Sequence, residues 1–334
     1  MDENRSLFYC PTPHTLVGYV LAPIISLEFI FGLAGNGLAL WVFCFRVKVW
    51  KTYMVYMLNL VISDLLLIIF LPFRIDNYTR GEDWVFSETF CGVNLLMLAM
   101  NRTASICFLT AITMDRYFKV VHPNHRFNII TLTGAVKVAV VLWIWTALMS
   151  MHLVNAKLVQ RSENKTLCRS YSSYEQTTPD MIWHGVLFFM EFLVAFSLII
   201  FCTCRIVCKL RGTKAGTQGK IRSITRLVIL IVIEFAICFM PSIVSAVLAL
   251  GVKTLYPKNC GKFFIYGSLF HGTFAFTYLN SVLDPVIYCF SSRSFKQSYR
   301  KTLRSVRPRK IEFSEGNEKR SNGRETFQQS LERL

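Results

Sequence analysis

The stretch CGVNLLMLAMNRTASICFLTAITMDRY, residues 91–117, begins at Cys91 and ends at Tyr117. It is long and apolar enough to cross a bilayer as a helix, because about 20 apolar residues suffice. Near its middle lies Arg102. A charged side chain at that depth costs about 3 kcal/mol or more unless it faces protein or water. Arg102 therefore predicts a functional site inside a bundle of helices.

The composition of the whole chain is that of a membrane protein. Hydrophobic residues make up 53% and charged residues 17%, whereas a soluble domain carries about 25% charge. The net charge of +17 raises the alternative of nucleic-acid binding. The basic residues fall in short clusters between apolar runs, and no zinc-finger, basic-zipper or stacking motif accompanies them. The clusters instead favour loops on the cytoplasmic side of a membrane.

The apolar runs predict an all-α fold, a bundle of seven transmembrane helices. Basic residues gather after the first, third and fifth runs, for example at Arg46, Arg116 and Lys209. By the positive-inside rule these loops are cytoplasmic and the N-terminus is extracellular. The expected spans are residues 17–45, 53–78, 88–121, 132–153, 182–210, 222–250 and 263–290.

Four segments are expected along the chain. Residues 1–16 form an extracellular N-terminus and residues 17–290 the seven-span domain. Residues 291–306 form a short amphipathic helix on the membrane surface, because Phe295, Tyr299 and Leu303 recur at helical spacing among basic residues. Residues 307–334 are polar and predict a disordered cytoplasmic tail.

External cysteines and asparagines agree with this topology. Cys10, Cys91, Cys168 and Cys260 fall in external segments, where disulfides persist. Four cysteines allow three connectivities, and we expect Cys91 to pair with Cys168 and Cys10 with Cys260. The glycosylation pattern Asn-X-Ser/Thr occurs outside at Asn4, Asn77 and Asn164.

Polar residues within the spans predict a cation site. Asp64 lies in the second span and Asp284 in the seventh, and two carboxylates in one bundle repel each other unless they share a cation or a proton. With Asn101, Ser105 and Asn280 they would form an oxygen-rich pocket suited to a sodium ion that acts allosterically. The alternative is a hydrogen-bond network that only joins the helices.

Six short motifs occur in order along the spans. They are Gly35-Asn36, Leu60-Val61-Ile62-Ser63-Asp64, Asp115-Arg116-Tyr117, Trp143, Cys238-Phe239-Met240-Pro241 and Asp284-Pro285-Val286-Ile287-Tyr288. The ordered set resembles the rhodopsin-like (class A) G-protein-coupled receptors and covers nearly the whole chain. Residues 101–105 and 270–292 resemble the oxoeicosanoid receptor. Residues 27–33, 71–74 and 122–123 are similar to the hydroxycarboxylic acid receptors of the same cluster. We expect the oxoeicosanoid branch to be the nearer one.

The resemblance implies a ligand and partners. Both groups bind small or fatty carboxylic acids outside the cell and couple to inhibitory Gi/o proteins, which lower cyclic AMP. We therefore expect a plasma-membrane receptor for an oxidised fatty acid of the oxo-eicosanoid type. A receptor for a short hydroxy acid, such as lactate or hydroxybutyrate, is the alternative. Arrestin and receptor kinases are further implied partners.

Arg102 occupies the position that anchors the ligand carboxylate in the hydroxycarboxylic acid receptors. A guanidinium makes two-pronged, charge-assisted hydrogen bonds to a carboxylate. The alternative is a structural ion pair, for example with Glu191. Arg74 and His184 either aid recognition of the acid or face water at the rim. The further candidate ligand residues are Tyr278, Ser170, Arg74 and His184.

The motifs at the cytoplasmic side imply a two-state activation switch. Asp115, Arg116 and Tyr117 end the third span, and a charged pair there can hold the helix end closed. Phe239 and Pro241 mark a break in the sixth span, because proline removes a backbone hydrogen bond. In the seventh span the switch residues are Asp284, Pro285 and Tyr288.

The sequence does not support an enzyme or a transporter. Neither Gly-X-Ser-X-Gly nor His-Glu-X-X-His occurs, and these are the common motifs for a hydrolytic nucleophile or a catalytic metal. Transporters usually show repeated halves or paired broken helices, and the chain has no internal repeat. A receptor is therefore the expected function, and no enzymatic activity is expected.

Overall fold

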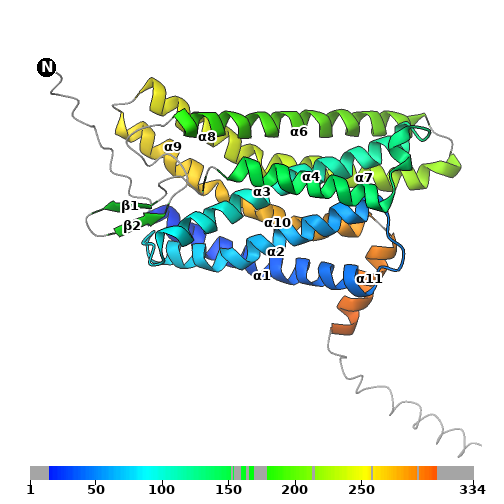
Figure 1. Cartoon of the computed structure of the whole chain (residues 1–334), viewed down its shortest axis with the longest axis horizontal. Coiled ribbons are helices and arrows are strands. Elements are labelled where there is room, and N and C mark those ends of the chain that lie inside the picture. Colours follow the sequence, from blue (N-terminus) through cyan, green and yellow to red (C-terminus); the bar gives the residue numbers. More distant parts are fainter. Residues whose placement is uncertain are drawn as a thin grey trace, which may run out of the picture.

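A computed structural model describes residues 15–151, 153, 159–162, 165–168, 179–212, 215–256, 259–291 and 293–306. It is an all-helical bundle with one small sheet (Figure 1). The elements are α1 Thr15–Phe45, α2 Thr52–Thr79, α3 Glu88–Val121, η1 Arg126–Ile129, α4 Leu132–Ser150, β1 Val159–Ser162, β2 Lys165–Cys168, α6 Pro179–Arg211, α7 Ala215–Cys238, α8 Met240–Leu255, α9 Cys260–Gly272, α10 Phe274–Ser291 and α11 Arg293–Val306.

The two ends of the bundle differ. The strands β1 and β2 lie at one end, called here the disulfide end, and α11 leaves the other, called here the α11 end (Figure 1). Six stretches in the described part are long and apolar enough to cross a membrane: α1, α2, α3, α4, α6 and the α7–α8 pair. With the α9–α10 pair they make up the expected seven-transmembrane bundle, so the chain is a multi-pass membrane protein.

The sixth and seventh spans are each divided into two helices. α7 ends at Cys238 and α8 begins at Met240, so the break lies at Phe239, just before the proline that cannot donate a backbone hydrogen bond. The seventh span was expected as one helix over residues 263–290, yet it divides at Thr273. The Thr273 hydroxyl donates to the carbonyl of Phe270 at 2.7 Å, a local hydrogen bond that competes with the helical ladder.

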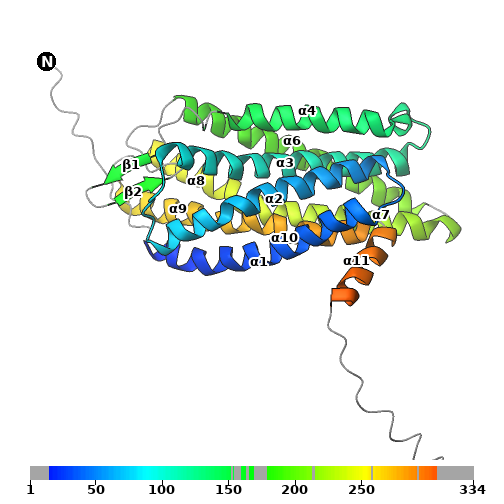
Figure 2. The same cartoon turned by 60° about the horizontal axis from the view of Figure 1, so that its bottom comes forward.

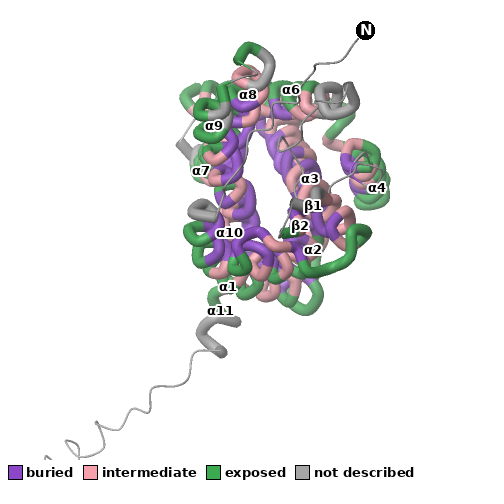
Figure 3. The backbone as a smooth tube through the Cα atoms, turned by 90° about the vertical axis from the view of Figure 1, so that its left-hand side faces the viewer, coloured by how far each residue is buried: buried purple, intermediate pink, exposed green. Residues whose placement is uncertain are grey.

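Burial assigns the helices to inner and outer positions. In the most apolar 18-residue stretch of each helix, 61% of the residues of α2 and 56% of those of α3 are buried, but only 17% of those of α4. Figure 2 shows α4 and α1 at opposite edges of the bundle, with α2 and α3 between them. Seen from the disulfide end in Figure 3, buried residues face inward and exposed residues face outward. α2 and α3 are therefore inner helices of the bundle, whereas α4 lies at its periphery.

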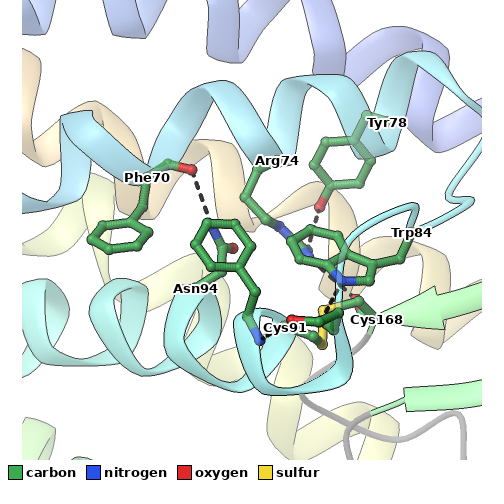
Figure 4. The surroundings of a disulfide bond; sticks show 9 residues. Phe70, Arg74, Tyr78, Trp84, Cys91, Asn94 and Cys168 are labelled. Carbon is green, nitrogen blue, oxygen red and sulfur yellow. Dashed lines mark hydrogen bonds between the residues drawn. A yellow bond between two sulfur atoms is a disulfide. The ribbon is translucent and has the colours of Figure 1, made fainter.

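The expected disulfide between Cys91 and Cys168 is present (Figure 4). It joins the first turn of α3 to the end of β2, which pairs antiparallel with β1 so that Val159 lies opposite Cys168. The Trp84 backbone nitrogen also donates to the Thr166 carbonyl at 2.7 Å. The hairpin is thus fastened across the disulfide end of the bundle.

Other expected external features have different outcomes. Asn77 is only 3% exposed within α2, so its amide is not presented to solvent in the folded chain, and its glycosylation stays a prediction. Asn4, Asn164 and Cys10 lie outside the described residues, as do residues 1–14 of the expected N-terminal segment 1–16 and the whole of the expected tail 307–334. Cys260 begins α9.

α11 follows α10 at the opposite end. Phe295 is 3% exposed, and its ring centre lies 4.9 Å from that of Phe43 in α1. Tyr299 stacks on Phe295 at 6.2 Å. The apolar face of α11 therefore packs against α1 and α10. The basic residues Lys296, Arg300 and Lys301 belong to the same helix.

Candidate functional site

A pocket near the disulfide end brings two predicted arginines together. Its cavity volume is about 50 Å³, which is room for several water molecules. Its lining contains Arg74 and Arg102 but no Asp or Glu, so the wall is electropositive. The lining residues are Arg74, Leu95, Leu98, Ala99, Arg102, Leu153, Phe270, Phe274, Thr277 and Tyr278.

Arg102 lies between this pocket and α6. Its guanidinium carbon is 3.5 Å from the ring centre of Phe188, within the range of a cation–π interaction. Glu191, one turn further along α6, attracts Arg102 electrostatically. Aromatic and acidic side chains of α6 therefore offset the cost of a charge in mid-membrane.

Glu191 is itself fixed by donors from two other helices. Its carboxylate accepts hydrogen bonds from Thr103 at 3.4 Å and from the indole of Trp145 at 3.3 Å. The Cys107 thiol lies 3.7 Å from the same carboxylate. Because these donors already satisfy Glu191, Arg102 interacts with it through charge and does not supply its principal hydrogen bonds. Whether Arg102 is a ligand anchor or a structural partner of Glu191 stays a prediction.

Arg74 is 4% exposed, so the alternative that it faces water at the rim is wrong. Its guanidinium donates to the carbonyl of Cys168 at 3.2 Å and to the hydroxyl of Tyr78 at 3.3 Å. Figure 4 shows Arg74 pointing from α2 towards the disulfide. β2 thereby holds Arg74 at the wall of the pocket.

Tyr278 completes the polar part of the pocket. It is 4% exposed, lines the cavity with both arginines and interacts with Arg74. Its ring stacks on Phe274 at 6.5 Å. Ser170 lies outside the described residues, and His184 belongs to α6 but its side chain is not described.

The predicted cation-site residues meet in the middle of the bundle. Asp64 accepts hydrogen bonds from Asn101 at 3.2 Å, from Ser281 at 2.7 Å and from Tyr288 at 3.2 Å. Ser281 was not predicted, although it lies four residues after Thr277 and three before Asp284 on the buried face of α10. The signal in the sequence is this spacing, which places Ser281 on the same helical face as Thr277 and Asp284.

Asn280 connects the rest of the group. Its amide donates to Ser105 at 3.1 Å and to one oxygen of Asp284 at 2.8 Å. The other Asp284 oxygen and the Asn280 carbonyl are buried without a hydrogen-bond partner, and such oxygens suit a sodium ion. Within the described residues, no three His, Cys, Asp or Glu side chains are grouped as a metal site, so a sodium ion would need amide and hydroxyl oxygens in addition to the carboxylates of Asp64 and Asp284.

Glu234 is a further buried acid that the sequence analysis missed. It is 3% exposed on α7, and both carboxylate oxygens lack a hydrogen-bond partner. Its charge is felt by Asp64 and Asp284. The signal was present as one acid within the apolar run of residues 222–250.

The predicted switch at the α11 end is paired differently than expected. Asp115 binds Lys119 at 2.6 Å and accepts from Thr52 at 2.8 Å, whereas Arg116 lies 3.9 Å from it. The Arg116 guanidinium instead stacks on the ring of Tyr53, at 3.5 Å. Tyr117 makes a hydrogen bond of 3.1 Å to His122. Arg116 is therefore buried at the α11 end, with the Tyr53 ring as its nearer contact and Asp115 as an ion-pair partner at 3.9 Å.

The switch residues of the sixth and seventh spans are buried near the cation-site group. Phe239 is 1% exposed and packs edge-on against Phe235 at 5.0 Å. Pro285 lies within α10 and packs closely against Gly35 of α1. A Cβ atom added at Gly35 would lie 2.8 Å from the proline ring, so only glycine fits there. Tyr288 is fully buried, and its bond to Asp64 joins the switch to the cation-site group.

Comparison with known proteins gives a consistent result. The family model described as "7 transmembrane receptor (rhodopsin family)" matches residues 35–288. Human hydroxycarboxylic acid receptor 2 is 41% identical over 87% of this chain and 80% of its own length. Human oxoeicosanoid receptor 1 is 40% identical over 90% and 76%. The mouse 12-(S)-hydroxy-5,8,10,14-eicosatetraenoic acid receptor is 35% identical over 90% and 94%. These values do not single out the oxoeicosanoid branch.

Proposed function

Because the chain belongs to the rhodopsin family of seven-transmembrane receptors, in the hydroxycarboxylic acid and oxoeicosanoid receptor cluster, we propose that it detects a carboxylic acid at the plasma membrane. The observation that carries this proposal is the pocket wall with two arginines and no acid. A guanidinium remains charged and can hold both oxygens of a carboxylate. Neutralising the ligand's charge there also reduces the cost of burying Arg102.

The relatives support the same ligand class. Their names refer to hydroxycarboxylic acids, to oxoeicosanoids and to 12-(S)-hydroxy-5,8,10,14-eicosatetraenoic acid. All of these ligands carry a carboxylate. The proposed polar contacts are therefore Arg102 as the main anchor, with Arg74 and Tyr278 as further donors and Ser170 and His184 as residues of the lid and rim.

The size of the pocket favours a short acid as the first candidate. A cavity of about 50 Å³ is closer in size to a hydroxy acid of a few carbon atoms than to a long acyl chain, which requires the pocket to open much further. An oxidised fatty acid is the second candidate. It is favoured by the apolar lining, to which Leu95, Leu98 and Phe274 contribute.

The signal passes to the α11 end along shared helices. α3 carries both Arg102 and Arg116, and α10 carries both Tyr278 and Tyr288. Asp64 accepts hydrogen bonds from Asn101 of α3 and Tyr288 of α10. A ligand that moves either helix therefore also changes these hydrogen bonds. The proposed orientation has the disulfide end outside and the α11 end facing an inhibitory Gi/o protein, with arrestin and receptor kinases as further partners there.

A panel of acids tests the ligand proposal. Lactate, hydroxybutyrate, medium-chain acids and an oxo-eicosanoid are applied to cells that express wild type or Arg102→Gln, with cyclic AMP measured with and without pertussis toxin. We expect one acid class to lower cyclic AMP in wild type alone, and toxin to abolish the response. The matched control is Arg80→Gln, because Arg80 is an exposed arginine paired with Asp76 at 2.9 Å. Full potency in Arg102→Gln at equal surface expression would exclude the anchor role.

A further inference from the structure

Two exposed thiols lie on α6 where its lipid-facing surface ends. Cys204 and Cys208 are one helical turn apart, and neither forms a disulfide. The exposed face that leads to them includes Val194 at 53%, Leu198 at 38% and Phe201 at 53% exposure. Exposed apolar side chains on a spanning helix face the hydrocarbon of the bilayer. The two thiols therefore lie at the end of a lipid-facing surface of α6.

Packing against α3 fixes their depth in the membrane. Ile206, which lies between the two cysteines, is fully buried and clusters with Val120 and Val228. One turn earlier, Phe201 contacts Tyr117 with ring centres 5.8 Å apart. Because Val120 lies in the last turn of α3, the thiols lie at the level where α3 leaves the membrane at the α11 end.

Basic residues begin at the same level. Arg205 and Lys209 are exposed on α6, and Lys209 and Arg211 lie in its last turn. Cations in this position interact with the anionic headgroups of the cytoplasmic leaflet. The thiols thus occupy the boundary between acyl chains and headgroups, and cysteines next to the membrane in this way are typical acceptors of reversible S-acylation.

We propose that Cys204 and Cys208 are S-acylated with long-chain fatty acids. The cysteine sulfur attacks the thioester carbonyl of a fatty acyl-CoA, a new carbon–sulfur bond forms, and the bond to the coenzyme A sulfur breaks. Coenzyme A leaves as a thiol that carries the proton lost by the cysteine, so the exchange needs no oxidant or reductant. The attached chain extends along the lipid-facing surface of α6. The proposal rests on the proposed orientation, because acyl-CoA is available on the cytoplasmic side.

The other free cysteines in the described part provide comparisons. Cys202 and Cys238 are buried and cannot reach an acyltransferase, and Cys107 and Cys289 are only partly exposed. Cys44 is exposed near the end of α1, at the α11 end of the bundle, but it is a single thiol beside the segment where Phe43 packs against Phe295 of α11. Cys44→Ser is therefore the matched control.

Metabolic labelling with an alkyne analogue of palmitate tests the proposal. The full-length receptor is expressed in cells, purified and coupled to a fluorophore. We expect wild type to carry label that hydroxylamine removes, since hydroxylamine cleaves thioesters. Cys204→Ser/Cys208→Ser should lose at least about four fifths of the label at equal surface expression, and Cys44→Ser should keep it.

Three results would overturn the proposal: no label on wild type, undiminished label on the double variant, or loss of the label in Cys44→Ser. Epitope tags at the two termini check the orientation in the same cells. An N-terminal tag stained on intact cells, together with a C-terminal tag stained only after permeabilisation, verifies the orientation. If the receptor shows that staining but carries no label, the acylation proposal is refuted, whereas the proposed function as a carboxylic-acid receptor is not affected.

Discussion

The guanidinium carbon of Arg102 lies 3.5 Å from the ring centre of Phe188, and Glu191, one turn along α6, attracts the same charge. Arg102 is thus held on the α6 side while it also lines the pocket with Arg74 and Tyr278. A ligand carboxylate competes with these α6 residues for the guanidinium. Ligand affinity therefore depends on how strongly α6 holds Arg102 as well as on the pocket itself.

Glu191→Gln should increase affinity for the carboxylate ligand by about threefold to tenfold, since the competing charge is worth on the order of 1 kcal/mol. The glutamine oxygen can accept from the Trp145 indole, and its amide NH2 can donate to the Thr103 hydroxyl, so folding is preserved. Competition binding with the most potent acid of the panel measures the change. Lower affinity in a receptor of normal surface expression would show that Glu191 supports ligand binding.

Arg74→Gln should weaken ligand binding by about tenfold, because a charge-assisted hydrogen bond contributes roughly 1.5–3 kcal/mol. Part of the loss arises because Arg74 also donates to the Cys168 carbonyl. Concentration–response curves for cyclic AMP measure the effect, and Arg80→Gln should leave them unchanged. If both variants behave like wild type, Arg74 has only a structural role.

Cys168→Ser should reduce both ligand response and surface expression, because loss of a native disulfide typically costs about 2–5 kcal/mol. The hairpin would remain attached through hydrogen bonds of Thr166 and Lys165 to residues 81–84, and the Cys168 carbonyl that Arg74 contacts would no longer be fixed by the disulfide. Flow cytometry of an epitope tag and ligand binding measure the two effects. A receptor with unchanged binding would show that the hairpin does not position Arg74.

The sequence was sufficient for the bundle because its signals are local. Apolar length predicts each span, and the proline at 241 predicts the break at Phe239. The Cys91–Cys168 disulfide was expected from topology, since both cysteines were assigned to external segments. Buried acids outside the known motifs were harder to recognise. Glu234 is hidden within a run whose average remains apolar, and only the packing of α7 against α10 reveals that it is buried near Asp284.

Pairing between long side chains could not be predicted from spacing. Asp115 and Arg116 are neighbours in sequence, yet adjacent residues on a helix point in different directions. Lys119 lies one turn from Asp115 and binds it at 2.6 Å. Arg116 points instead into the bundle and stacks on Tyr53. The choice depends on helix rotation and on an aromatic residue of α2, neither of which the motif specifies.

Asp64→Asn should abolish the effect of sodium on agonist affinity. In wild type we expect 100 mM sodium to lower agonist affinity relative to a large organic cation, because the ion would stabilise the arrangement in which Asp64 and the unpartnered oxygens of Asp284 and Asn280 surround it. Radioligand binding in the two salts measures this at constant ionic strength. A wild-type receptor that is insensitive to sodium would instead favour the hydrogen-bond network as the sole role of these residues.

Glu234→Gln should make the receptor more stable without changing the ligand pocket. The substitution replaces a buried carboxyl group whose ionised form has no hydrogen-bond partner and repels Asp64 and Asp284. A gain of about 1–2 kcal/mol is in the range for relief of an unpaired buried charge, so the melting temperature in detergent should rise by a few degrees. Glu88→Gln is the control, because Glu88 begins α3 at the exposed disulfide end.

A lower melting temperature of Glu234→Gln would mean that the carboxylate has a stabilising partner, for which a bound cation is the first candidate. Repeating the melt with and without sodium distinguishes that case, since only a cation-bound carboxylate makes wild-type stability depend on the ion.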